Sequence, residues 1–330
     1  MDLTSLYYFS ELAKDLNMTK TAARLYISQQ TLSNHIHRLE QYYNAPLFYR
    51  KPSLSLTCAG EFVLSFAQIV EKEHVNLKDI LSDIEGQERG MLRVGASLAR
   101  GVQFLPRILP DFCRRYPKVE VRFTDGLSSR LEEMIEHGEL DFAIVLSKSR
   151  SPNLVEHDLL QDQVYLCVPE SLLQTHYTPE EAAAIKARSR QGAQLQDFSR
   201  LPFSLLTNRL GTQLHDCFSK AKFQPVVFFT GTYTNQTLPL CAKGLTACYC
   251  THMSLIENYH QVSEGINIFP LLDQGAPIFQ SLTLIRHRQR YLTHFAKYFI
   301  DLLFQVTERL EQFQVTRIID IPSPAGLELK

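Results

Sequence analysis

Residues 19–40 read TKTAARLYISQQTLSNHIHRLE, in which two helical patterns follow each other across a short turn. The first pattern, over 19–26, contains the adjacent small residues Ala22 and Ala23, which let another helix approach closely. The second begins at Ser28, a residue type that caps helices, and continues to about residue 42. Its apolar side chains recur every three or four positions, which predicts a buried stripe. That stripe consists of Leu32, Ile36, Leu39 and Tyr43.

The other face of this second helix carries hydrogen-bonding side chains with little charge, including Gln29, Ser33 and Asn34. A solvated helix face is usually rich in Glu and Lys, whereas amides and hydroxyls can contact base edges and phosphates. This composition favours a helix that reads DNA. An ordinary polar face is the alternative, and the composition by itself does not separate the two.

The flanking segments favour the DNA-reading interpretation. Upstream, the apolar spacing over residues 4–16 predicts an amphipathic helix. Downstream, the basic turn Arg50-Lys51-Pro52 precedes the alternating pair Leu54 and Leu56, which indicates a small hairpin. The complete order of elements describes a winged helix-turn-helix.

These residues resemble the DNA-binding domain of LysR-type transcriptional regulators over residues 2–60. The matching motifs are Ala22-Ala23-x-Leu25-x-Ile27-Ser28-Gln29, Leu32-Ser33-x-x-Ile36-x-x-Leu39-Glu40, Pro46-Leu47-Phe48-x-Arg50 and Leu56-Thr57-x-Ala59-Gly60. Two features depart from the family pattern: Gln30 replaces the usual proline or serine, and the wing is one residue short and lacks a second arginine. The resemblance implies that residues 1–60 bind double-stranded promoter DNA. The residues expected to contact DNA are Thr19, Lys20, Ser28, Gln29, Gln30, Thr31, Ser33, Asn34, His37, Arg38, Arg50 and Lys51.

Residues 61–90 form the predicted linker, a long helix that starts after the capping residue Thr57 and ends near Gly86. Apolar positions in steps of three and four predict a coiled coil between two chains, interrupted by Glu73. The predicted contact residues are Val63, Phe66, Val70, Leu77, Ile80 and Ile84. The alternative is that this stripe packs on the preceding domain of the same chain. The resemblance implies a dimerising linker, and we expect a homodimer that assembles into a homotetramer.

From residue 91 onward, apolar strand patterns alternate with helical ones, which predicts an α/β fold with a parallel sheet covered on both faces. The family resemblance continues here and implies a bilobed, doubly wound effector-binding domain like that of type 2 periplasmic binding proteins. We expect lobe I to comprise 91–164 and 270–330, and lobe II to comprise 165–269, with a crossover near Tyr165 and a return near Phe269. Residues 174–197 look like an insertion.

Ligands of such sheets bind beyond the carboxyl ends of the strands, where hydroxyls, amides and helix starts can hold a polar group. The predicted effector contacts are Ser97, Arg100, Gly126, Leu127, Ser128, Ser147, Thr207 and Asn208. A carboxylate effector would suit this set, because Arg100 could pair with it through two hydrogen bonds. The alternative is that the hydroxyl and amide side chains only cap helices.

The overall composition excludes several other classes. The net charge of the 330 residues is −1, so any attraction to DNA must be local, and no apolar run is long enough to span a membrane. Seven cysteines without metal-ligand spacing predict a reducing cytoplasm and no metal site, and catalytic motifs are absent. We therefore expect a regulator rather than an enzyme, with no cofactor besides a small-molecule effector, and with RNA polymerase as a further partner. Two alternatives stay open: a cysteine-based redox sensor, and a solute-binding α/β protein that does not act on DNA.

Overall fold

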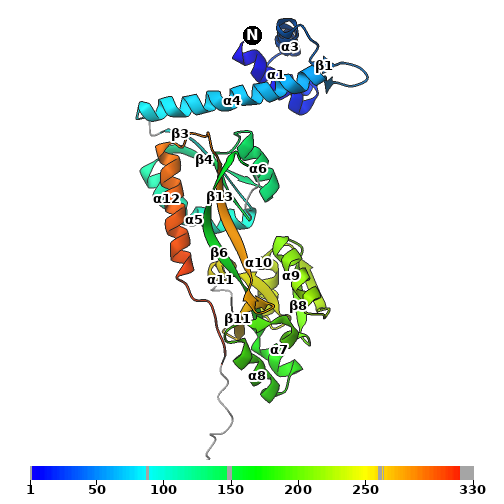
Figure 1. Ribbon diagram of the computed structural model, residues 1–330, viewed down its shortest axis with the longest axis vertical. Coiled ribbons are helices and arrows are strands. Elements are labelled where there is room, and N and C mark those ends of the chain that lie inside the picture. Colours follow the sequence, from blue (N-terminus) through cyan, green and yellow to red (C-terminus); the bar gives the residue numbers. More distant parts are fainter. Residues whose placement is uncertain (1, 87–88, 147–150, 259–261, 263, 320–330) are drawn as a thin grey trace, which may run out of the picture.

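The computed structural model describes residues 2–86, 89–146, 151–258, 262 and 264–319. Figure 1 shows a small helical domain at the top, a long helix that extends from it, and an elongated two-lobed domain below this helix. The first two parts comprise α1 (Leu3–Asp15), α2 (Met18–Arg24), α3 (Gln29–Tyr43), β1 (Phe48–Tyr49), β2 (Ser55–Leu56) and α4 (Cys58–Ile84).

The helices of the amino-terminal domain begin at side-chain caps. Asp2 caps α1, and Ser28 accepts a hydrogen bond from the amide of Thr31 at the start of α3. The predicted helices over 4–16 and 28–42 are confirmed to within one residue. Helix α2, predicted over 19–26, runs from Met18 to Arg24, because Asn17 supplies its cap. The hairpin is present and pairs Phe48 with Leu56. The core between α1, α3 and the hairpin includes Leu6, Phe9, Leu12, Leu32, Ile36, Leu39 and Phe48.

The upper lobe of the larger domain consists of strands and helices that alternate along the chain. Its elements are β3 (Arg89–Ala96), α5 (Leu98–Arg115), β4 (Lys118–Asp125), α6 (Ser128–Glu136), β5 (Phe142–Val145) and α12 (His294–Glu311). β3 lies between β4 and β5 and is parallel to both. Helices α5 and α12 pack together on the sheet, and Phe112 and Phe299 meet there edge to face.

The lower lobe has its own apolar core around Phe198, Phe203 and Phe269. Its helical elements are α7 (Glu170–His176), α8 (Pro179–Ser189), the 3-10 helix η1 (Leu195–Phe198), α9 (Arg209–Lys220), α10 (Thr234–Ala242) and α11 (His252–Glu257). Its strands are β7 (Ala193–Gln194), β8 (Pro202–Leu206), β9 (Val226–Gly231), β10 (Cys248–Thr251), β11 (Ile266–Asp273) and β12 (Ala276–Pro277). The segment expected to be an insertion, 174–197, forms the end of α7, α8, β7 and part of η1.

Two long strands connect the lobes, β6 (Leu154–Pro169) and β13 (Phe279–His287), and they run side by side in Figure 1. They pair antiparallel, from Phe279 opposite Gln163 to His287 opposite Leu154. The expected parallel pairing is confirmed for β3, β4 and β5 and for β8 with β9, whereas β6 and β13 pair antiparallel, so the large sheet is mixed. Strand β6 contributes buried apolar residues to the cores of both lobes, Leu160 to the upper one and Leu166 to the lower one. The chain was expected to return to the upper lobe near Phe269. It returns through β13 instead, and Phe269 itself packs in the core of the lower lobe.

Candidate DNA interface and effector domain

The predicted reading face of α3 points away from the rest of the molecule. Helix α3 lies on the side of the domain opposite the two lobes (Figure 1). Gln29, Gln30 and Asn34 are exposed, whereas Ser33 is partly buried. Gln30 donates to the amide oxygen of Asn34 at 3.2 Å, and the hydroxyl of Thr19 donates to Gln29 at 3.4 Å. These contacts hold the polar side chains in a row while leaving them accessible to a groove.

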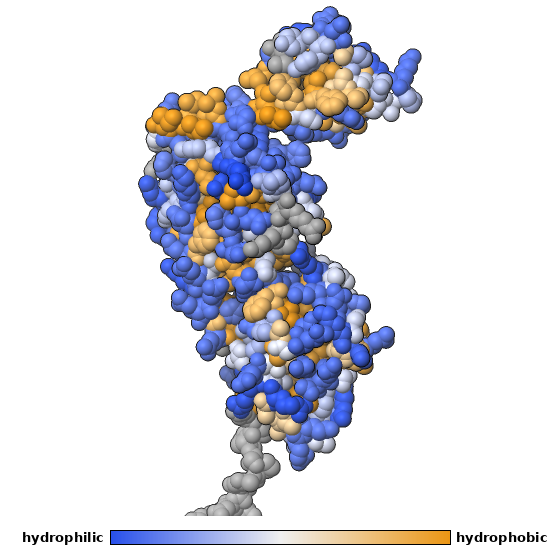
Figure 2. Space-filling model, viewed as in Figure 1, coloured by the Kyte–Doolittle hydropathy of each residue, from blue (hydrophilic) through white to orange (hydrophobic). Residues whose placement is uncertain are grey.

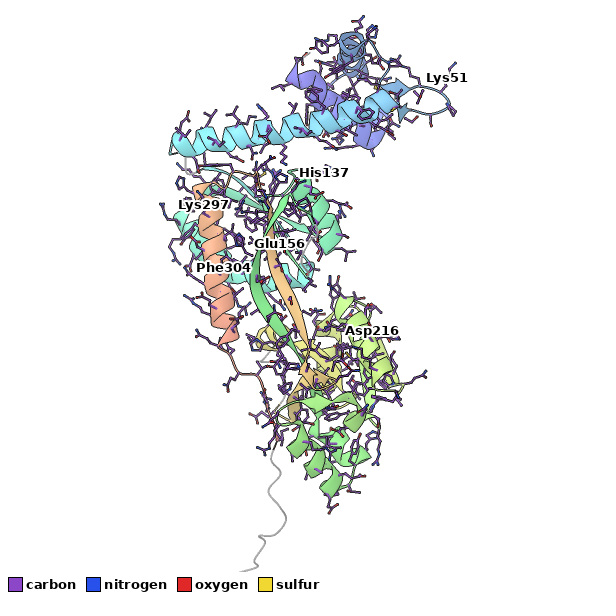
Figure 3. The ribbon with its side chains drawn as sticks, in the orientation of Figure 1. Lys51, His137, Glu156, Asp216, Lys297 and Phe304 are labelled. Atoms are coloured by element: carbon purple, nitrogen blue, oxygen red, sulfur yellow. The ribbon has the colours of Figure 1, made fainter. Side chains whose placement is uncertain are left out.

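The remaining predicted DNA contacts are also exposed: Thr19, Lys20, Ser28, Thr31, His37, Arg38, Arg50 and Lys51. Lys51 lies at the tip of the β1–β2 hairpin, away from the domain core (Figure 3). Arg50 is 65% exposed and lies 3.4 Å from Glu40, so its guanidinium keeps donors free for a phosphate. The predicted DNA contacts on α2, α3 and the hairpin are therefore all exposed, apart from the partly buried Ser33.

Ion pairs fix the position of α2. Arg24 pairs with Glu11 and with Asp15, and Lys20 approaches Asp15 at 3.0 Å. Hydrogen bonds from Arg24 and Lys20 lower the pKa of Asp15 to about 2. Because all partners of this cluster lie on α1 and α2, it anchors the helix that precedes the reading helix.

Sequence reasoning did not single out Tyr26, which lies close to the predicted DNA contacts of α3. Its side chain is 96% exposed at the turn between α2 and α3, and its φ of 53° is left-handed. Its hydroxyl is a group that can donate a hydrogen bond to a phosphate. The signal available in the sequence was a tyrosine close before the cap of the reading helix.

Helix α4 presents three different faces. Val63 and Val70, two residues of the predicted seam, pack against the core of the amino-terminal domain within the same chain. For these two residues the dimer assignment is corrected, because helical twist turns their side of α4 toward α1. The exposed apolar stripe is displaced from the predicted one and consists of Phe62, Phe66, Ile69, Leu77, Leu81 and Ile84. Figure 2 shows hydrophobic surface toward both ends of this helix.

The third face of α4 is polar and joins the upper lobe. Arg290, on the turn after β13, donates to Asp79 at 2.6 Å, to Asn76 at 2.7 Å and to Asp141 at 2.6 Å. Only 2% of the Arg290 side chain is exposed. Asp83 adds contacts from the hydroxyl of Tyr291 and the amide of residue 294, both at 3.0 Å. This buried network sets the angle at which the linker helix meets the effector domain.

The upper-lobe effector residues gather at one edge of the sheet. The amide of Gly126 donates to the carbonyl of Ala96 at 3.2 Å, and the amide of Leu146 donates to the hydroxyl of Ser128 at 3.1 Å. Ser97 starts α5 without making a side-chain cap, whereas Leu127 is largely exposed. The loops after β3, β4 and β5 therefore meet as expected for a ligand-holding edge. Ser147 lies outside the described residues.

The other predicted effector residues, Thr207 and Asn208, lie on the lower lobe. The hydroxyl of Thr207 donates to the carbonyl of Gly231 at 3.3 Å, and Asn208 caps α9 by accepting from the amide of Gly211 at 3.1 Å. Asn208 also donates to the carbonyl of Thr232 at 2.8 Å. Asn208 therefore caps a helix, as the alternative interpretation held, and its amide also ties two loops together.

Arg100 is not available to an effector. It faces the interior from the first turn of α5, and its guanidinium donates to Asp162 at 2.6 Å and to Gln280 at 3.2 Å. Asp162 is fully buried, and its second oxygen accepts from the amide of Met253 at 3.0 Å. The predicted contact between Arg100 and a carboxylate ligand is corrected, because this arginine already neutralises a buried acid.

The cysteines in the lower lobe are buried. Cys167, Cys241, Cys248 and Cys250 line one small core, in which the sulfur atoms of Cys167 and Cys250 lie 3.6 Å apart. Hydrogen bonds from the Cys248 and Cys250 thiols lower the pKa of Cys167 to about 5, whereas burial raises the pKa of Cys217, outside this core, to about 11. Within the described residues, no cluster of three or more His, Cys, Asp or Glu side chains is placed to hold a metal. Burial keeps these thiols away from solvent, but the lowered pKa of Cys167 and its short distance to Cys250 leave the cysteine-based redox sensor open as an alternative.

Two family models match the chain. Residues 3–61 match the helix-turn-helix of bacterial regulatory proteins of the lysR family, and residues 85–308 match the LysR substrate binding domain. The chain is 26% identical to the uncharacterized HTH-type transcriptional regulator YcgK of Bacillus subtilis, over 92% of this chain and 94% of YcgK. It is 32% identical to the Hca operon transcriptional activator HcaR of Escherichia coli, over 51% of this chain and 57% of HcaR.

Solved structures share the fold. A full-length OxyR variant from Pseudomonas aeruginosa aligns with a TM-score of 0.63 at 20% identity, covering 96% of this chain and 100% of the OxyR chain. CbnR in complex with its target DNA aligns with a TM-score of 0.55 at 18% identity, covering 92% of this chain and 99% of CbnR. Among the described residues, no helix is long and apolar enough to cross a membrane.

The exposed reading helix, the wing, the linker helix and the two-lobed domain define a transcriptional regulator that binds DNA and carries an effector-binding domain. The chain belongs to the LysR family. The alternative of a solute-binding protein that does not act on DNA is therefore wrong.

Proposed function

We propose that α3 reads base edges in the major groove through Gln29, Ser33 and Asn34, while Arg50 and Lys51 of the wing contact phosphates. The observation that carries this proposal is the row of exposed amides on α3, on the side of the domain opposite the effector lobes. A promoter in the cytoplasm is the proposed target, with RNA polymerase as a further partner and no catalytic role.

Replacing Gln29 with alanine is expected to remove a base contact and to cost about 1–3 kcal/mol on the preferred site, with relaxed preference at one base position. Arg50→Ala, the matched control, should weaken binding to all sequences alike. The measurement is a fragment-shift titration on selected and random DNA at two salt concentrations. An equal loss on both DNAs for Gln29→Ala would contradict the reading role of α3.

We also propose that the exposed stripe of α4 holds two chains together, and that the dimers assemble into tetramers. Phe62, Phe66 and Ile69 are 75%, 42% and 60% exposed, and apolar surface of this extent on a regular helix indicates an interface. A dimer joined through its two α4 helices would carry two DNA-binding domains, which would contact two half-sites of the DNA.

Introducing glutamate at Phe66 should weaken self-association by about 2 kcal/mol or more, because the seam would bury an unpaired charge. The neighbouring exposed Ser65 provides the control Ser65→Glu, which should keep the parental mass. Sedimentation velocity at micromolar protein concentration measures the mass of the Phe66→Glu and Ser65→Glu variants and of the parent. If the Phe66 variant keeps the parental mass, the stripe does not mediate association.

The effector is proposed to bind between the lobes, against Ser97 and Ser128 above and Thr207 and Asn208 below. A ligand that touches both lobes stabilises one closure over another, and only such differential contact can carry a signal to the linker helix. With Arg100 already paired, its guanidinium no longer supports a carboxylate as the effector.

Ser128→Ala and Thr207→Ala are expected to shift the effector dose-response about tenfold while leaving effector-free DNA binding intact, because each removes one hydrogen bond. Thermal-shift screening of a metabolite panel first identifies the effector. Promoter occupancy is then measured with and without it, with Ser129→Ala as an exposed neighbouring control. An unchanged dose-response in both variants would overturn the interlobe assignment.

A further inference from the structure

A chain of hydrogen-bonding side chains joins the start of α1 to the flank of the reading helix α3. Its members, in order, are Asp2, Ser5, His35 and Arg38. Arg38 is among the predicted DNA contacts, whereas His35 is not. We propose that His35 is a positioning residue, which holds the guanidinium of Arg38 in place for a phosphate of the bound DNA. This inference rests on the proposed function, in which α3 lies in the major groove.

The hydrogen bonds of this chain run in one direction. The hydroxyl of Ser5 donates its single hydrogen to Asp2 at 3.0 Å. The Ser5 oxygen lies 2.8 Å from Nδ1 of His35 and therefore accepts the hydrogen of that ring nitrogen. With the ring hydrogen on Nδ1, the lone pair of Nε2 is free to accept from the guanidinium of Arg38, which lies 3.2 Å away. Burial and the charge of Arg38 lower the pKa of His35, so the ring is neutral at neutral pH and keeps this lone pair.

The ring of His35 is fixed against α1. Tyr8 packs edge to face with it, with ring centres 4.8 Å apart. Ser5 is 1% exposed, and its backbone amide donates to Asp2 at 2.7 Å, which is the hydrogen bond that caps α1. Because the partners of the ring belong to a capped helix, the direction of the Nε2 lone pair is fixed as well.

Arg38 lies beside the reading face and is exposed. It follows Asn34 by four positions, so the two side chains are neighbours on the surface of α3. Within the described residues, Arg38 makes hydrogen bonds only to the ring of His35, and most of its five N–H donors therefore remain for a phosphate. An arginine that is already oriented loses less side-chain freedom when it binds, which lowers the entropic cost of the complex.

The first test compares single variants of the full chain by fluorescence anisotropy titration on labelled selected and random DNA, at neutral pH and several salt concentrations. Arg38→Ala should weaken binding to both DNAs about tenfold and lower the slope of log affinity against log salt by about one, as expected for one lost phosphate contact. His35→Ala should weaken binding to both DNAs about fivefold, because Arg38 then has to be ordered on binding.

Two further variants show whether His35 acts through Arg38. In the Arg38→Ala background, His35→Ala should cause no further loss of affinity, because the group that it positions is already gone. His35→Gln should stay within about twofold of the parent, since its amide can accept from Arg38 and donate to Ser5. Circular dichroism checks that each variant is folded.

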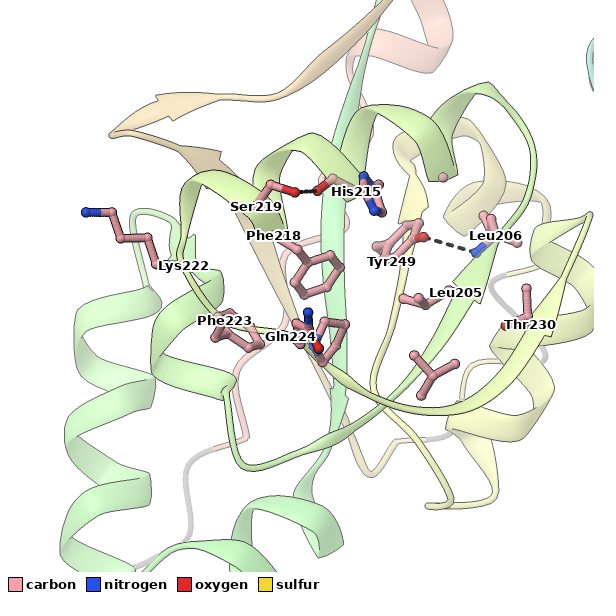
Figure 4. Close-up of a pocket in the computed structure, with 13 residues that line it drawn as sticks. Leu205, Leu206, His215, Phe218, Ser219, Lys222, Phe223, Gln224, Thr230 and Tyr249 are labelled. Carbon is pink, nitrogen blue, oxygen red and sulfur yellow. Dashed lines mark hydrogen bonds between the residues drawn. The ribbon is translucent and has the colours of Figure 1, made fainter.

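Tyr249→Phe is the control for the loss of one hydrogen bond of the fold. In the lower lobe, the hydroxyl oxygen of Tyr249 accepts from the amide of Leu206 at 3.0 Å (Figure 4). Removing this hydroxyl should leave the affinity for DNA at the parental value, because the contact does not involve the reading helix.

The proposal is overturned if His35→Ala weakens binding equally with and without Arg38, or if Arg38→Ala keeps the parental salt slope. It is also overturned if His35→Gln loses as much affinity as His35→Ala, or if Tyr249→Phe does. Gln29→Ala, titrated alongside, keeps this failure apart from that of the proposed function. If Gln29→Ala relaxes base preference while one of these outcomes occurs, α3 still reads DNA and only the role of His35 is removed.

Discussion

Replacing Arg100 with leucine is expected to lower the free energy of unfolding of the effector domain by about 3–5 kcal/mol. The arginine is 5% exposed, and its partner Asp162 is fully buried on β6, where both carboxylate oxygens are hydrogen-bonded. Removing the guanidinium leaves a carboxylate inside the protein without a counter-charge, which is more costly than losing a surface pair. Urea titration followed by circular dichroism measures the change.

Two further variants identify the cause. Arg114→Leu removes an arginine from the same helix, but this side chain is 77% exposed, so a change below about 0.5 kcal/mol is expected. The double variant Arg100→Leu with Asp162→Leu removes both charges and should regain much of the lost stability. If the single variant Arg100→Leu is as stable as the parent, the pair does not hold the lobe together, and a role for Arg100 in ligand binding would need to be considered again.

Arg290→Met is expected to have a comparable effect, about 3–5 kcal/mol, because it leaves the buried Asp141 only the more distant guanidinium of Arg93, at 3.6 Å, and removes the contacts that join α4 to the upper lobe. Beyond stability, the angle between the linker helix and the effector domain should become variable. Small-angle X-ray scattering in buffer without denaturant should show a broader distribution of maximum dimensions for the folded variant than for the parent protein.

The neighbouring residues provide controls for Arg290. Arg288 is exposed two positions earlier, and Arg288→Met should leave stability unchanged. Burial raises the pKa of Asp79 in spite of the nearby guanidinium, so its charged form is disfavoured and Asp79→Asn should cost little. Asp141→Asn should cost more, since Asp141 also accepts from the amide of Arg93 at 2.7 Å. Equal effects of Asp79→Asn and Asp141→Asn would contradict this division of roles.

The amino-terminal domain could be predicted closely because its signals are local. Caps such as Ser28 and Thr57 lie next to the helices that they start, and the spacing of Leu32, Ile36 and Leu39 follows from helical geometry alone. The long linker helix was predicted for the same reason, since Thr57 and Gly86 lie at its two ends. The exposed polar face of α3 followed from the same periodicity.

The direction of the strands could not be read in this way. Apolar runs such as 164–168 and 282–285 are equally typical of buried parallel and buried antiparallel strands. Their antiparallel pairing is set by β6 and β13 each passing once between the lobes, which involves residues more than a hundred positions apart.

For this protein, the sequence alone determined α1, α3 and α4, the caps Ser28 and Thr57, the exposed polar face of α3 and the family. The tertiary structure decided which partner each buried group has. Phe62 and Val63 are adjacent and both apolar, yet the first is 75% exposed and the second packs on α1. Arg100 follows a strand as a ligand-binding arginine would, yet it pairs with Asp162 in the interior. The physical reason is that periodicity specifies which residues share a face, whereas burial and ion pairing depend on what the folded chain places against that face.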